Sequence, residues 1–165
     1  MAFFFKALVA LFTMVDPIGL VPVVLGLTGG YAFAARVVII SRATLIAAGI
    51  IAVFGAFGQL IFASLGVTQE AFSIAGGALL FLVAIDMLFG RPSGARETPR
   101  EEVDARARED VSVFPLAIPM IAGPGTITTI ILLVQTAGER PTALMAIAVA
   151  AMLTLAAAWL AMMVS

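Results

Sequence analysis

VFPLAIPMIAGPGTITTIILLVQT, residues 113–136, is apolar and long enough to cross a bilayer, yet Gly123-Pro124-Gly125 interrupts it in the middle. Proline lacks a backbone N–H and glycine has little helix preference, so we expect the helix to break there and to leave backbone groups unpaired. In hydrocarbon, such groups are tolerated only where protein or a water-filled cavity satisfies them. Taken alone, this segment leaves two interpretations open: a kink that serves packing, or the floor of a small-molecule site.

Three threonines follow the interruption, at Thr126, Thr128 and Thr129. They would lie in the first turn of a restarting helix, where backbone amides are free and the positive end of the helix dipole favours an anionic group. The pattern therefore predicts a cradle for a carboxylate.

A second interruption divides the first apolar segment, residues 2–27, at Asp16-Pro17-Ile18-Gly19. Two interrupted apolar segments in corresponding positions of two halves are the best sequence indication of a transporter's binding site. The pair favours a site over a kink. The candidate substrate-binding residues are Asp16, Pro17, Gly19, Gly123, Pro124, Gly125, Thr126, Thr128 and Thr129.

The composition is that of an integral membrane protein. Of the 165 residues, 62% are hydrophobic and 12% charged, and the mean hydropathy is +1.17, which excludes a soluble globular domain. The chain has no Cys and no His, so we expect no disulfide, metal or cofactor, and no enzyme that uses histidine as a base. The net charge of −1 and the lack of a basic cluster argue against a nucleic-acid partner.

The apolar segments predict an all-α, polytopic fold with five spans, two of them interrupted. The uninterrupted spans are expected at residues 37–65, 70–89 and 142–164. Ser73 and Gly77 have the spacing of small residues that favours close helix packing in the third span. Residues 91–112 form a polar linker, which separates a first half, 1–90, from a second half, 113–165.

The distribution of positive charge predicts the orientation of the spans. With the N-terminus outside, seven basic residues fall on the cytoplasmic side and two outside. The inner set is Arg36, Arg42, Arg91, Arg96, Arg100, Arg106 and Arg108, and the outer set is Lys6 and Arg140. We therefore expect a periplasmic N-terminus and a cytoplasmic 91–112 loop.

The second interruption lies three spans after the first, and an odd offset reverses the direction of the chain. The halves are therefore expected to form a 3+3 inverted repeat that lacks its sixth span, with both breaks facing each other at the midplane.

Three stretches resemble the MarC family of bacterial inner-membrane proteins: residues 16–22 (DPIGLVP), 75–88 (AGGALLFLVAIDML) and 118–126 (IPMIAGPGT). The resemblance implies six spans, of which this sequence supplies five, and a place among the LysE-type transporters, which include the SnatA-like neutral amino acid transporters. The family often has Asn at the position of Asp16. A carboxylate there favours ion coupling, because it is costly in a membrane unless it binds a cation or a proton.

The leading hypothesis is a secondary transporter of small neutral amino acids in the bacterial inner membrane. The amides and hydroxyls of residues 123–129 would hold the substrate carboxylate, and Asp16 would hold the ammonium group or a coupling ion, H⁺ or Na⁺. The oligomeric state stays open. The alternatives are a non-transporting membrane protein, a channel, or an intramembrane enzyme that uses Asp16 and Asp86. Asp86 is otherwise interpreted as an interfacial residue paired with Arg91.

Overall fold

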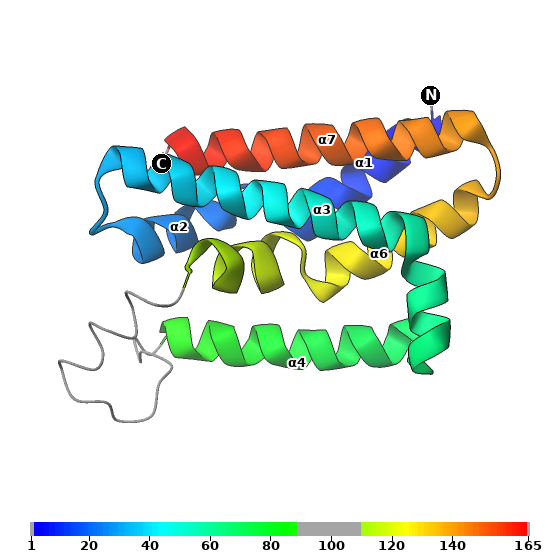
Figure 1. The fold of residues 1–165 in the computed structure, drawn as a ribbon, viewed down its shortest axis with the longest axis horizontal. Helices are drawn as coiled ribbons and strands as arrows, with labels where there is room; N and C mark the ends of the chain where they lie inside the picture. The colour runs from blue at the N-terminus through cyan, green and yellow to red at the C-terminus, as the bar shows by residue number, and fades with distance from the viewer. Residues whose placement is uncertain (1, 89–109, 165) are drawn as a thin grey trace.

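The computed structural model describes residues 2–88 and 110–164, and these two ranges are helical with short connections (Figure 1). The elements are α1 (Ala2–Val15), α2 (Leu20–Thr28), α3 (Phe33–Leu65), α4 (Gln69–Leu88), η1 (Ser112–Ile121), α6 (Pro124–Ala137) and α7 (Pro141–Val164). The predicted all-α class is confirmed. The predicted pairing of Asp86 with Arg91, and most of the 91–112 linker, lie outside the described residues and side chains.

Three helices are long and apolar enough to cross a membrane: Ala2–Thr28, which joins α1 and α2, Phe33–Leu65 and Pro141–Val164. A fourth span results if η1 and α6 count as one bent span. Within the described residues α4 does not meet these criteria, so the five-span count and the 3+3 repeat stay predictions.

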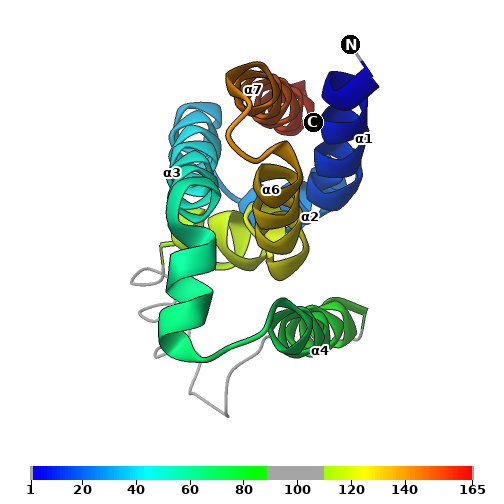
Figure 2. The same cartoon turned by 90° about the vertical axis from the view of Figure 1, so that its right-hand side faces the viewer.

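The bundle is built around α7 and α3. α7 packs along α1, and α3 contacts η1, α6 and α7. Figure 2 shows α3 and α1 on opposite sides with α7 and α6 between them, and α4 apart from the rest. Van der Waals packing holds such helices together in lipid, and the fully buried side chains here include Leu11, Val24, Ile40, Leu116, Ile121, Ile131 and Met162.

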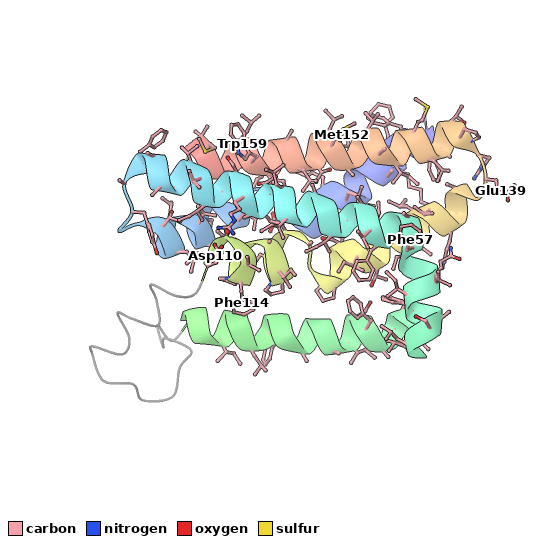
Figure 3. The ribbon with its side chains drawn as sticks, viewed as in Figure 1. Phe57, Asp110, Phe114, Glu139, Met152 and Trp159 are labelled. Carbon is pink, nitrogen blue, oxygen red and sulfur yellow. The ribbon has the colours of Figure 1, made fainter. Side chains whose placement is uncertain are left out.

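Polar side chains tie the helices together at one end of the bundle. The Arg36 Nη2 donates to the Met162 carbonyl at 3.1 Å, and the Trp159 indole N–H donates to the Ser41 hydroxyl at 3.0 Å. Asp110, at the same end as Trp159 in Figure 3, pairs with Arg42 at 2.7 Å. The hydroxyl of Ser112 donates to Asp110 and, with the Arg42 charge, lowers the pKa of Asp110.

The opposite end contains the N-terminus and the turn between α6 and α7. The Arg140 guanidinium lies 5.9 Å from the centroid of the Phe3 ring, which places these two segments together. Arg140 and Arg42 therefore lie at opposite ends of the bundle, as the predicted distribution of positive charge requires. Which side faces the cytoplasm stays a prediction.

The first half of the predicted fourth span is less regular than expected. In η1 the backbone is extended at Phe114 and Ile118, which precede Pro115 and Pro119 through cis peptide bonds. Proline disfavours the helical conformation of the residue before it, so η1 consists of helical turns separated by two extended residues. The prediction of a plain half-helix was wrong at these positions.

Candidate functional site

The first predicted break lies between α1 and α2 and is organised by Asp16. Asp16 has a positive φ of 45°, its amide donates to the Phe12 carbonyl at 3.0 Å, and its Oδ1 accepts the Gly19 amide at 3.1 Å. The carboxylate therefore closes the turn that leads into α2, at the end of the helix where the dipole favours a negative charge. A Cβ at Gly19 would overlap this carboxylate, so a larger residue there would force the Asp16 side chain to move.

Asp16 is exposed on the surface of the described chain, whereas the neighbouring Pro17 is buried. Within the described residues, the recorded side-chain bond of Asp16 goes to Gly19 and not to α6. The Asp16 carboxylate thus lies at a break within an apolar span. Its Oδ1 accepts the Gly19 amide, and its Oδ2 has no hydrogen bond among the described residues. A charge in such a place is a functional candidate because it is costly in hydrocarbon.

The second predicted break lies between η1 and α6, whose axes bend by 51°. η1 closes with a wide turn, in which the Ala122 amide donates to the Ala117 carbonyl at 2.9 Å. α6 begins at Pro124, and its first bond joins the Ile127 amide to the Gly123 carbonyl at 2.9 Å. A Cβ at Gly123 would overlap the Pro119 carbonyl, so glycine is needed for the backbone to pass this close.

The three threonines after the break have different surroundings. Thr126 is 1% exposed, and its hydroxyl donates to the Ile121 carbonyl at 3.0 Å, which joins the end of η1 to the start of α6. The Thr128 hydroxyl lies 3.0 Å from the hydroxyl of Ser73 in α4, and Thr129 is half-buried. Among the described residues no side chain caps the N-terminus of α6, so the amides of its first turn are the groups that an anionic ligand would bind.

The two breaks are neighbours in the bundle. The Met14 sulfur, two residues before Asp16, lies 3.1 Å from the place that a Cβ of Gly125 would occupy. On another side, Gly76 of α4 is packed so closely on Pro124 that a Cβ there would overlap the proline ring. α1 and α6 therefore contact each other next to both breaks, while the expectation that the breaks face each other at the midplane stays a prediction.

Sequence reasoning missed Met14 and Gly76 as neighbours of the second break. It selected Ser73 and Gly77 as the packing face of the third span, whereas the structure places Gly76 against α6 and leaves open space at Gly77. The Gly76-Gly77 pair was the available signal, but an apolar helix does not reveal which of two adjacent glycines faces a neighbour.

The nine candidate residues differ in exposure: Asp16 is exposed, the rest are buried or half-buried. Three cavities among the described residues lie away from these nine residues. One of these cavities, of about 300 Å³, lies between α3, α6 and α7 and is lined by small and apolar side chains such as Ala48, Gly55 and Ala151. At the second break, Thr126 is buried and Gly76 of α4 lies against Pro124.

Residues 1–165 match the MarC family of integral membrane proteins. The chain is 40% identical over 133 residues to the UPF0056 membrane protein MJ0972 of Methanocaldococcus jannaschii, covering 81% of this chain and 58% of that protein. It is 38% identical over 130 residues to YvbG of Bacillus subtilis, covering 78% and 62%, and 34% identical over 128 residues to YhcE of Escherichia coli, covering 78% and 60%.

No solved structure matches the chain. The matched region spans about 60% of the length of these relatives, which are named only as membrane proteins. The match to the family over residues 1–165 and the apolar spans lead to one conclusion: this chain belongs to the MarC family of integral membrane proteins.

Proposed function

We propose that the chain forms part of a secondary transporter for small neutral amino acids, and that the two helix breaks hold the zwitterionic head of the substrate. The observation that carries the proposal is the pairing of opposite chemistry at neighbouring breaks. The α6 break offers uncapped amides, the α1–α2 break carries the Asp16 carboxylate, and Met14 and Gly125 bring the two segments together.

The carboxylate of the amino acid would bind at the first turn of α6. The amides of Gly125 and Thr126 belong to that turn, and the helix dipole there favours an anion. The Thr126 hydroxyl already donates to Ile121, so we assign it to holding the break rather than to donating to the substrate. The hydroxyls of Thr129 and of Thr128, which also contacts the Ser73 hydroxyl, remain as side-chain groups for the substrate carboxylate.

Asp16 would bind the ammonium group or a coupling cation, H⁺ or Na⁺. One of its oxygens accepts the Gly19 amide, and the other is not used in a recorded bond. An unpaired carboxylate within a span is unfavourable by a few kcal/mol, about 2.5–3.5 on insertion scales, so a positive partner offsets a real cost. The residues at the breaks are mostly glycine and threonine, whose small size suits a substrate with a small side chain.

Flux measurements in proteoliposomes test this proposal. We expect labelled glycine or alanine to enter vesicles that contain the protein, and accumulation to follow an imposed H⁺ or Na⁺ gradient. Alaninamide and N-acetylalanine, which each lack one of the two charges, should compete poorly, because each loses one half of the site. Flux equal to that of protein-free vesicles would contradict the proposal. Equal competition by both blocked analogues would contradict the two-ended site.

A further inference from the structure

The packing of α4 differs from that of the other long helices. Within the described residues its extended contact is with α6 alone, whereas α3 and α7 each pack against three or more elements. Most of its described surface is exposed, and Ile74, for example, is 74% exposed. Figure 2 shows α4 set apart from the bundle.

The contact between α4 and α6 is made at the break itself. Gly76 lies directly on the ring of Pro124, the first residue of α6, and Ser73 lies with its hydroxyl 3.0 Å from that of Thr128. These two points are about one helical turn apart on each helix. α4 therefore covers one side of the first turn of α6, where the proposed substrate carboxylate binds.

α4 is connected to the bundle through the C-terminal end of α3. The last turns of α3 bend away from the bundle in Figure 1 and lead into a tight turn at Gly66, which has a φ of 64°. The Val67 amide donates to the Phe62 carbonyl at 3.1 Å, and the Phe62 and Phe72 rings pack with centroids 5.0 Å apart. The turn is well held, while α4 beyond it is fixed to the bundle by the α6 contact.

We propose that α4 is a flap over the second break, which must lift from α6 before a substrate can reach the first turn of that helix. The contacts of Ser73 with Thr128 and of Gly76 with Pro124 hold the flap closed. This inference rests on the proposed transport function for its purpose, but the movement itself can be measured without transport.

The first experiment uses a matched pair of substitutions on adjacent residues. The chain has no Cys, so Ser73→Cys introduces its single thiol. Gly76→Ala places a methyl group into the Pro124 ring, whereas Gly77→Ala places it into open space. We expect N-ethylmaleimide to label Ser73→Cys faster by about tenfold in the Gly76→Ala background, the scale of an overpacked contact, and by less than about twofold in the Gly77→Ala background.

Equal labelling in the two backgrounds would overturn the closed contact. If the Gly76→Ala variant fails to fold, it will aggregate in detergent. In that case the flap is tested with the Ser73→Cys protein alone, labelled with and without saturating alanine. If the flap moves when the site is occupied, alanine should change the labelling rate, and an unchanged rate would contradict the flap.

The second experiment locks the flap. With their hydroxyl oxygens 3.0 Å apart, Ser73 and Thr128 are within reach of a disulfide when both are replaced by Cys. An oxidant removes the two thiol hydrogens as the S–S bond forms, and dithiothreitol restores them. Both states lack the Thr128 hydroxyl, so their comparison isolates the lock. We expect exchange of labelled alanine to stop on oxidation and to return on reduction.

The outcomes separate the two proposals. If the wild-type protein moves amino acids and the oxidised pair moves them as fast as the reduced pair, the flap is wrong and the transport function stands. If the wild-type protein moves no amino acid, the transport function fails. The contrast between Gly76→Ala and Gly77→Ala still tests the flap in that case. If the reduced Ser73→Cys/Thr128→Cys protein is itself inactive, the flap is tested by the effect of alanine on the labelling of Ser73→Cys.

Discussion

Two buried threonines allow a direct test of how the second break is held together. Thr126 and Thr154 are each 1% exposed, and replacement of either by Val removes a hydroxyl while keeping the shape of the side chain. The Thr126 hydroxyl donates to the last carbonyl of η1 at 3.0 Å, whereas the Thr154 hydroxyl has no hydrogen-bond partner among the described residues.

The two substitutions should therefore differ in sign. Loss of one side-chain hydrogen bond inside a membrane protein costs about 0.6 kcal/mol on average and about 1.7 at most, and leaving a buried carbonyl unpaired adds to this cost. We expect Thr126→Val to lower the free energy of unfolding by about 1 kcal/mol. Thr154→Val removes a desolvated, unpaired group and should be neutral or stabilising by up to about 1 kcal/mol.

Thermal unfolding of the purified protein in detergent measures this difference. For a chain of this size, about 1 kcal/mol corresponds to a shift of roughly 2–4 °C in the midpoint. We expect Thr126→Val to unfold at a lower temperature than the wild type, and Thr154→Val to unfold at the same or a higher temperature. Equal shifts for the two variants would show that the Thr126 hydroxyl does not join the half-helices, and the description of the break would be wrong.

Three further predictions follow from other parts of the structure. Gly66→Ala should destabilise by about 1 kcal/mol because of the positive φ at Gly66, whereas Gly49→Ala, in the middle of α3 with open space around it, should be neutral or stabilising in the same thermal assay. The pKa of Asp110 is lowered by the hydrogen bonds from Ser112 and, to a smaller extent, by the Arg42 charge, so the ionised carboxylate stabilises the fold at neutral pH and this contribution is lost as the pH falls below about 4. The difference in midpoint between wild type and Asp110→Asn should therefore shrink on acidification, and a constant difference would contradict the role of the ionised carboxylate. A reporter inserted in the 91–109 loop should be active only in its cytoplasmic form, and periplasmic activity there would reverse the orientation.

Hydropathy and the positions of glycine and proline were enough to locate the helices. The predicted spans at 37–65 and 142–164 became α3, Phe33–Leu65, and α7, Pro141–Val164. A membrane helix is set by its apolar length, and its bounds are marked by residues such as Gly66, which follows the end of α3, and Pro141, which begins α7. Both interruptions were also found where proline and glycine predicted them. These are local properties, so a single sequence carries them.

The sequence was less informative about which groups meet. Thr126 was expected to offer its hydroxyl to a ligand, but the bend brings it to the Ile121 carbonyl five residues earlier, and a bend angle is not encoded in the residue types alone. The choice of Gly76 over Gly77 depends on the rotation of α4 about its axis, and a helix that is apolar on all sides does not specify that rotation.

The irregular η1 had a local signal that went unused. Phe114 and Ile118 each precede a proline, and the residue before proline is restricted to extended conformations. Two such pairs four residues apart predict a segment that cannot be a continuous helix. This rule would have placed irregular backbone directly before the break.

The most direct test of the central claim, that the two breaks form one amino acid site, is equilibrium binding of labelled alanine to the purified protein. We expect Asp16→Asn to weaken binding or its dependence on H⁺ or Na⁺, because it removes the charge from the first break while keeping the shape of the side chain. Asp110→Asn, the same chemical change outside the spans, should bind as the wild type does. Identical binding and identical ion dependence in all three proteins would show that Asp16 is not part of the site.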